Sequence, residues 1–354
     1  MQLNTMLVPN LTIGLDIGDK SSCVCEIEAS GRVVRTAALK SSPAGIQEYF
    51  GQLPPSRVVM EVGTHSGWMS RQIQELGHEV IVANPSAVYG KGRRNRRNDA
   101  MDAEFLARQG RVDPSLLHPI KHRGADTQKH LAILRARDVL VSSRTKLINS
   151  VRGSVKAMGS RIARCSAPAF ARTALTQIPE ELRPALEPLL ETIAEMSKRI
   201  KSFDKEIEAV VAANYPEAER IQQIKGVGPV TALAFVLLIE DPKRFKRSRD
   251  VGAYFGLVPR LDESSESEPQ LRITKTGDKL GRRLLVSAAN YILGPFGPDC
   301  DLRRHGELIA ARGGKNAKKR AIVAVARKLA VLMHRLWVSS AQYEPDHLVQ
   351  RRAA

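Results

Sequence analysis

Four acidic residues in the first third of the chain have the type and spacing to hold a divalent metal ion. Asp16 lies in the apolar segment 11–18, which is typical of a central sheet strand, where a carboxylate is costly to bury unless a cation compensates it. Glu61 lies near the carboxyl end of a second such segment, and Asp99 and Asp102 share one face of an expected helix. Because Mg²⁺ prefers carboxylate oxygens, we expect these four residues to form a magnesium site.

Each of these acidic residues also has a purely structural explanation. Asp16 could cap the turn after its strand, and acidic residues favour the first turn of any helix because of the helix dipole. The helix with Asp99 and Asp102 follows a strongly basic loop and two strands that each carry a carboxylate. This combination favours the metal site over four separate caps.

The charge of the chain favours a polyanionic partner. Lys and Arg number 55 against 37 Asp and Glu, which gives a net charge of +18. Such an excess indicates nucleic acid first and an anionic membrane surface second. The apolar runs are too short to span a bilayer, the first ten residues lack a signal-peptide pattern, and the four cysteines show no zinc spacing. We therefore expect a cytoplasmic, nucleoid-associated protein.

Basic residues gather in several segments that are suited to phosphate. Segment 89–98 contains five of them and no acid, which indicates either a phosphate-binding loop or a solvated one. Segment 224–232 resembles the hairpin of a helix-hairpin-helix motif, in which glycines let backbone N–H groups approach a phosphate. The residues that we expect to contact nucleic acid are Lys91, Arg93, Arg94, Arg96, Arg97, Lys225, Lys275, Lys279, Arg282, Arg283, Lys315, Lys318, Lys319 and Arg320.

The order of the expected elements indicates an α/β domain followed by helices. Three strands in a meander, then helix, strand, helix and strand, predict an RNase H-like mixed sheet. A long helix at 127–155 and a heptad pattern at 189–210 predict a coiled-coil arm, paired within the chain or between chains. The expected divisions are a catalytic domain at 1–125, the arm at 126–220, a mainly helical domain at 221–340 and a loose tail at 341–354.

Taken in succession, these motifs resemble the DEDD transposases of bacterial insertion sequences, the family of bridge-RNA-guided serine recombinases. The resemblance covers nearly the whole chain. The segments that carry it are Gly-Leu-Asp-Ile-Gly at 14–18, Met-Glu at 60–61, Asp-Ala-Met-Asp-Ala at 99–103, Ile-Lys-Gly-Val-Gly-Pro at 224–229, Gly-Leu-Val-Pro at 256–259, Arg-Ile-Thr-Lys at 272–275 and Lys-Arg-Ala-Ile at 319–322. It implies that the first domain is RuvC-like and that its D-E-D-D residues are Asp16, Glu61, Asp99 and Asp102.

The resemblance also implies a nucleophilic serine in the C-terminal transposase domain. In the family this serine precedes a glycine, a short fixed distance before the Arg-Ile-Thr-Lys segment. Counting back from Ile273 leads to Ser264, which is followed here by Ser265 instead of glycine. Ser264 is therefore the expected nucleophile, with Ser265 and then Ser267 as alternatives, and a flexible acidic loop is the plain explanation for all three.

What the resemblance implies about activity is DNA strand cleavage and exchange through a covalent phosphoserine, assisted by Mg²⁺. The implied partners are donor and target DNA, a noncoding bridge RNA that selects them, and further copies of the chain in a homo-oligomer. Three other functions stay open: a RuvC-like junction endonuclease that uses water, an actin-like kinase suggested by Asp-Ile-Gly at 16–18, and a non-catalytic nucleic-acid-binding protein.

Overall fold

The computed structural model describes residues 10–84, 98–262 and 271–346. The chain divides into two compact units, residues 1–124 and 125–354, and each is described by itself. Thus the segments expected to form an arm and a separate C-terminal domain lie in one unit. None of the helices within the described ranges is both long and apolar enough to cross a membrane.

The first unit is built on a five-stranded mixed sheet. Its strands are β1 (Leu11–Asp16), β2 (Ser21–Glu28), β3 (Val33–Lys40), β4 (Arg57–Glu61) and β5 (Glu79–Ala83). Their order is β3-β2-β1-β4-β5, with the β1–β2 and β2–β3 pairs antiparallel and the β1–β4 and β4–β5 pairs parallel. This confirms the expected mixed sheet, which is compatible with an RNase H-like fold.

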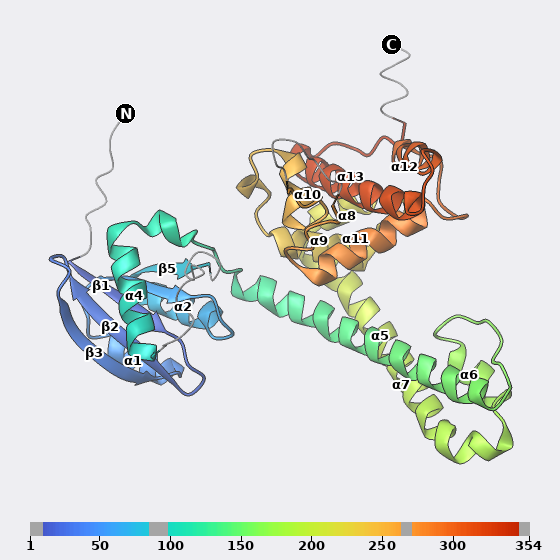
Figure 1. The fold of residues 1–354 in the computed structure, drawn as a ribbon, viewed down its shortest axis with the longest axis horizontal. Helices are drawn as coiled ribbons and strands as arrows, with labels where there is room; N and C mark the ends of the chain where they lie inside the picture. The colour runs from blue at the N-terminus through green and yellow to red at the C-terminus, as the bar shows by residue number, and fades with distance from the viewer. Residues whose placement is uncertain (1–9, 85–97, 263–270, 347–354) are drawn as a thin grey trace, which may run out of the picture. The chain divides into compact units, whose positions relative to one another are not determined.

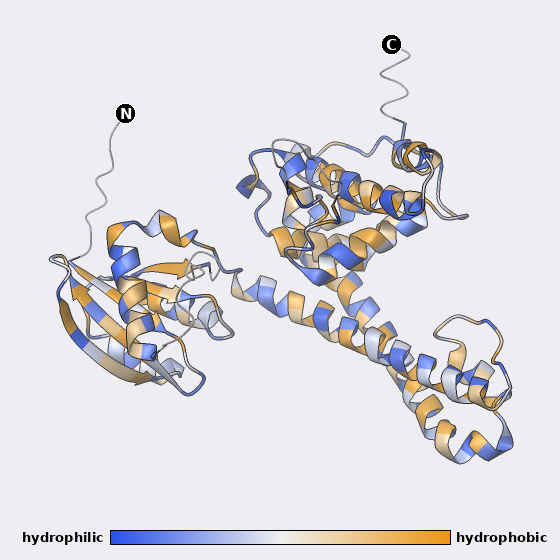
Figure 2. Ribbon diagram, in the orientation of Figure 1, coloured by the Kyte–Doolittle hydropathy of each residue, from blue (hydrophilic) through white to orange (hydrophobic). Residues whose placement is uncertain are grey.

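Helices cover both faces of this sheet (Figure 1). On one face, α1 (Pro43–Phe50) and α2 (Ser66–Glu75) pack on apolar strand residues that include Leu15 and Met60. On the other face, α4 (Asp99–Val112) crosses β1, β2 and β4, and the short turn η1 (Pro114–Leu117) follows it. The central strands β1 and β4 are covered on both sides and are almost wholly buried, whereas the edge strand β3 is mostly exposed, and the strand colours in Figure 2 are accordingly mixed.

Helix α4 approaches the sheet closely because a glycine lies at the contact on each side, Gly14 in β1 and Gly110 in α4. A Cβ atom on Gly14 of β1 would lie 1.8 Å from the carbonyl oxygen of Ala103 and 2.7 Å from the backbone nitrogen of Ala107. Gly110 at the other end of the helix would in the same way meet Val59 of β4. A glycine inside a strand often marks such a close approach of another backbone. Gly14 therefore fixes how deeply α4 sits.

We expect Gly14→Ala to destabilise the first unit by about 3 kcal/mol, because the added methyl group clashes with helix backbone that cannot rotate away. The measurement is denaturant unfolding of the full chain, followed through the transition of this unit. Gly63→Ala is the matched control, since a Cβ there meets nothing within 4 Å. Unchanged stability in Gly14→Ala would show that α4 does not sit as described.

The second unit begins with two long helices that pack side by side. These are α5 (Ala125–Ala157) and α7 (Arg183–Asn214), joined through α6 (Phe170–Leu175) and η2 (Glu180–Leu182). Arg137 bonds to Asp204 at 2.6 Å and Arg144 to Ser197 at 3.0 Å, so the helices run antiparallel. Hence the heptad segment pairs within the chain. Helix α7 starts before the expected position and contains Pro188 inside its first turns.

Two separate cores stabilise this helix pair. At its distal end, residues of α5, α6 and α7 form their own cluster around Phe170 and Ile193. At its near end, Leu134 of α5 and Ile207 of α7 belong to the core of the C-terminal helices. The arm and the C-terminal helices therefore share one hydrophobic core at the base of the arm.

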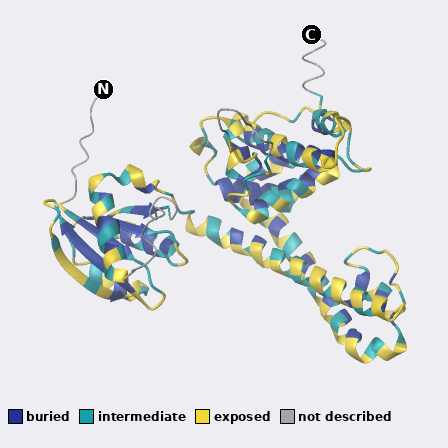
Figure 3. Cartoon of the chain, viewed as in Figure 1, coloured by how far each residue is buried: buried dark blue, intermediate teal, exposed yellow. Residues whose placement is uncertain are grey.

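The C-terminal helices surround α9, whose residues 232–239 are all buried (Figure 3). The elements are α8 (Pro216–Ile221), α9 (Pro229–Ile239), η3 (Pro242–Arg244), η4 (Ser248–Asp250), α10 (Val251–Tyr254), α11 (Lys279–Ile292), α12 (Asp301–Ala311) and α13 (Ala317–Ser339). The tail expected to be loose is in contact as far as it is described: the backbone N–H of Asp301 donates to the carbonyl of Pro345, and Tyr343 binds Gln223.

Candidate active site and nucleic-acid interface

The two strand carboxylates lie at the same edge of the sheet. β1 ends at Asp16 and the parallel β4 ends at Glu61, one step beyond the paired residues Leu15 and Met60. Asp16 is thus at the end of its strand instead of in the middle, and it is half-buried. Leu15 and Met60 face α1 and α2, so the alternation of strand side chains directs Asp16 and Glu61 to the face that α4 covers.

The direction of α4 brings its acidic first turn to this edge. The guanidinium of Arg57, at the start of β4, donates to the carbonyl of Gly110 near the end of α4 at 3.0 Å. The helix therefore runs opposite to β4, and its first turn, with Asp99 and Asp102, comes where the strand ends. Asn98 caps this turn by accepting a hydrogen bond from the N–H of Ala100 at 2.9 Å.

Two of these carboxylates also affect the pKa of a neighbouring thiol. Cys23 of β2 is the registered partner of Asp16. Burial raises the pKa of the Cys23 thiol, and the carboxylates of Asp16 and then Asp99 raise it further. Since charge–charge effects fall with distance, Asp99 of α4 and Asp16 of β1 both lie near this side chain.

The donor set fits a hard divalent cation, because all four candidate side chains supply carboxylate oxygen. Within residues 10–84, 98–262 and 271–346, however, no three His, Cys, Asp or Glu side chains lie close enough to share a metal ion. The four carboxylates thus share an edge and a face without forming a compact ligand cluster. Asp99 is exposed, while Asp16, Glu61 and Asp102 are half-buried.

The candidate nucleophile Ser264 and its alternatives Ser265 and Ser267 lie outside the described residues, but the residues on either side of this segment are described. The N–H of Arg260 donates to the carbonyl of Arg272 at 3.0 Å, and Pro259 forms an isolated β-bridge with Ile273. The two ends of segment 261–271 are therefore held together.

The Arg-Ile-Thr-Lys segment continues from this bridge in a strained conformation. Lys275 is exposed and has a φ of 56°, a left-handed conformation that costs a non-glycine residue about 1–2 kcal/mol. It is imposed by tight packing, since Cβ atoms on Gly256 and Gly277 would clash with the opposing backbone. Arg282 secures the same turn by donating to the carbonyls of Phe255 and Thr276 at 3.1 and 2.7 Å.

The structure separates the predicted nucleic-acid contacts into engaged and exposed groups. Arg282 holds the turn just described, and Arg283 forms an ion pair with Asp138 of α5, so both have structural partners. Lys225, Lys275 and Lys279 are exposed. The basic residues of the first-unit loop, Lys91, Arg93, Arg94, Arg96 and Arg97, lie outside the described residues.

The start of α13 combines positive side chains with a positive helix end. Lys315, Lys318, Lys319 and Arg320 are all exposed around its first turn, which contains no acidic residue. The helix dipole makes cations unfavourable there, by about 0.3–1 kcal/mol each. An anion bound at this end would remove the repulsion. The basic residues at the start of α13 therefore destabilise the free helix slightly and favour the binding of a phosphate backbone.

Comparison with known proteins decides the family. A model described as Transposase IS116/IS110/IS902 family matches residues 218–298, and a DEDD model described as Transposase matches residues 13–159. The transposase for insertion sequence element IS1328 of Yersinia enterocolitica is 31% identical over 292 residues, covering 81% of this chain and 85% of the relative. The chain belongs to the IS116/IS110/IS902 transposase family.

Two further relatives align with this chain over most of their length. A probable family 20 transposase of Pseudomonas aeruginosa is 30% identical and covers 79% of this chain and 83% of its own. The transposase for insertion sequence element IS1111A of Coxiella burnetii is 29% identical, with 94% and 90% covered. The DEDD match contains all four candidate carboxylates, and the other match contains the 263–270 segment.

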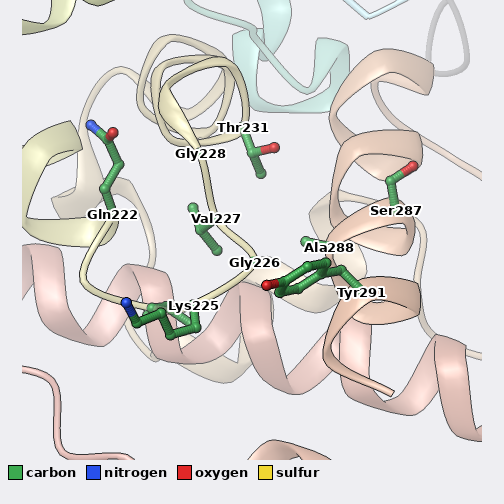
Figure 4. Close-up of a pocket in the computed structure, with 10 residues that line it drawn as sticks. Gln222, Lys225, Gly226, Val227, Gly228, Thr231, Ser287, Ala288 and Tyr291 are labelled. Atoms are coloured by element: carbon green, nitrogen blue, oxygen red, sulfur yellow. The ribbon is translucent and has the colours of Figure 1, made fainter. Parts of the chain in front are cut away.

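Sequence reasoning identified the turn at 224–228 but missed the side chains that face it from α11. Tyr291 and Ser287 of this helix line a cavity together with Lys225, Gly226 and Thr231 (Figure 4). The sequence places Tyr291 in an amphipathic helix, where an aromatic residue is expected in the core. Only the fold shows that it is 47% exposed.

Proposed function

We propose that this chain is the transposase of an insertion sequence and that it cuts and rejoins DNA strands with the carboxylates of its first unit and a serine of its second. One observation carries the proposal: in a member of this transposase family, two strand ends and one helix start bring Asp16, Glu61, Asp99 and Asp102 to the same edge and face of a mixed sheet. An actin-like kinase has no need of this acidic helix.

Asp16, Glu61, Asp99 and Asp102 would hold Mg²⁺ after moving closer together on substrate binding, because in this structure no three of these described residues lie close enough to share an ion. When bound, the ion would polarise the scissile phosphate and neutralise charge that develops on it. The protein residues contribute the positioning. Asp16 and Glu61 extend from buried strands, while Gly14 sets the depth of the helix with Asp99 and Asp102. Rigid elements of this kind hold catalytic groups more accurately than loops do.

Ser264 would be the nucleophile. Its Oγ forms a bond to the phosphorus, the bond from phosphorus to the 3′ oxygen breaks, the serine proton is lost to a base, and the leaving oxygen gains a proton. The product is a phosphoserine diester and a free 3′-hydroxyl. Because the phosphodiester energy is retained, a 3′-hydroxyl of another strand can reverse the step without ATP. This requires the carboxylates and the serine to meet at one phosphate, within one chain or between the chains of a homo-oligomer.

A noncoding bridge RNA would select donor and target by base pairing. The exposed Lys225, Lys275 and Lys279 and the start of α13 support backbone contacts, which carry no sequence information by themselves. They suit RNA and DNA equally, and for this reason the test must separate the two.

The experiment is a donor–target recombination assay with purified full-length chain and its transcribed flanking noncoding RNA. We expect joining with RNA and Mg²⁺ present, and loss of joining after RNase treatment or addition of EDTA. Adding back the RNA, or excess Mg²⁺, should restore it. Full activity of RNA-free protein would contradict selection by a bridge RNA. Activity unaffected by EDTA would contradict the need for a metal ion.

A further inference from the structure

A cavity in the second unit lies between the turn at 222–228, the start of α9 and the outer side of α11. It is a shallow pocket that is open to solvent, with a volume of about 470 Å³. Figure 4 shows the ring of Tyr291 beside the backbone of Gly226 and the side chain of Lys225 across the turn. The residues that line it are Gln222, Ile224, Lys225, Gly226, Val227, Gly228, Thr231, Ser287, Ala288 and Tyr291.

Gly226 is what lets the aromatic ring lie against this turn. Its φ is +97°, and a Cβ atom there would be 2.8 Å from Cδ1 of Tyr291. The ring thus packs on backbone at one point, while 47% of the residue remains exposed. Tyr291 is therefore a partly exposed aromatic residue that also lines the pocket.

The chemistry around the ring suits a nucleotide. Lys225 supplies a positive charge, and Thr231 and Ser287 supply hydroxyl groups. The described residues that line the cavity include no acid. Gly228 is the N-cap of α9 and has no side chain to hydrogen-bond the first backbone N–H groups. A cation and hydroxyls beside a flat aromatic surface match the two parts of a nucleotide, its phosphate and its base.

We propose that this cavity binds one unpaired nucleotide of a nucleic-acid strand, with its base stacked on Tyr291 and its phosphate at Lys225 and the glycine turn. The site reads a strand that is already single, such as the end of a guide RNA stem or a melted DNA end. This proposal rests on the proposed function only in that the ligand is nucleic acid. It does not depend on Ser264 or on the carboxylates.

The test compares the full chain with Tyr291→Leu, which keeps an apolar side chain, and Tyr291→Phe, which keeps the ring. Fluorescence anisotropy measures binding of labelled oligothymidylate, oligouridylate and the corresponding duplex. Stacking on an aromatic side chain contributes about 1–3 kcal/mol per base, so we expect Tyr291→Leu to weaken single-strand binding about tenfold. Tyr291→Phe should stay within about threefold of the unchanged chain, and duplex binding should change little.

Phe296→Leu is the matched control, because it removes an aromatic side chain that is 84% exposed but does not line the cavity. Photocrosslinking with an iodouracil-containing strand should place the crosslink on the peptide that contains Tyr291. The DNA and RNA arms show which strand is preferred. Equal losses in Tyr291→Leu and Phe296→Leu, no loss in Tyr291→Leu, or no binding of single strands by the unchanged chain would each overturn the site. Recombination by the unchanged chain is scored separately, so that a failure of the cavity is distinguished from a failure of the transposase function.

Discussion

Asp16→Asn is expected to reduce DNA strand cleavage on the order of 1,000-fold, which corresponds to about 4 kcal/mol of lost transition-state stabilisation. The physical reason is the position of Asp16 at the end of β1, on the face that α4 covers and next to Glu61 of β4. An amide at this position keeps the volume of the side chain but removes the negative charge that a divalent cation needs. The measurement is single-turnover cleavage of insertion-sequence-end DNA.

Asp19→Asn serves as the matched control for this prediction. Asp19 lies three residues further along, and its side chain is 89% exposed. We expect its cleavage rate to stay within about twofold of the unchanged chain, and the thermal unfolding of both variants to match it. A cleavage rate in Asp16→Asn equal to that of the control would remove Asp16 from the site. The first unit would then be better described as a non-catalytic nucleic-acid-binding unit.

Much of the first unit could be predicted because the buried strands are visible in the sequence as segments of apolar residues. Three strands in a meander followed by alternating helix and strand indicated the mixed sheet, and the structure has it. The exact position of Asp16 within its strand could not be predicted from the sequence pattern. Ile17 continues the apolar pattern, but the chain turns toward β2 directly after Asp16, so the carboxylate lies at the edge.

The packing of α4 was beyond the reach of sequence patterns. Asp99 and Asp102 indicate a helix start, but the direction of the helix across the sheet depends on contacts at its far end. The hydrogen bond from Arg57 to Gly110 and the close approach at Gly14 join residues that are far apart in the sequence. The same holds for Arg282 and Arg283. As basic residues they suggest phosphate binding. In the structure, however, Arg282 donates to the carbonyls of a turn and Arg283 pairs with a carboxylate of α5.

The proposal for the serine depends on the loop that carries it. The bridge between Pro259 and Ile273 and the bond from Arg260 to Arg272 hold both ends of this segment together. Next to it, Lys275 keeps a costly left-handed backbone conformation. Residues held in such strained conformations by their surroundings cluster at functional sites. The described residues next to the serine segment thus include an exposed cation, Lys275, which is suitable for a phosphate.

Ser264→Ala is therefore expected to abolish the covalent protein–DNA adduct while leaving DNA binding within about twofold, because one hydroxyl is removed and no charge is changed. The adduct is trapped on DNA that carries a nick in the opposite strand, so that the product end diffuses away, and mass spectrometry maps the modified residue. Ser265→Ala and Ser267→Ala are the matched controls in the same loop and should still form the adduct. If the adduct persists in Ser264→Ala and is lost in Ser265→Ala, the nucleophile is the neighbouring residue. If all three variants cleave DNA without any adduct, water is the nucleophile, and the chain works as a RuvC-like endonuclease.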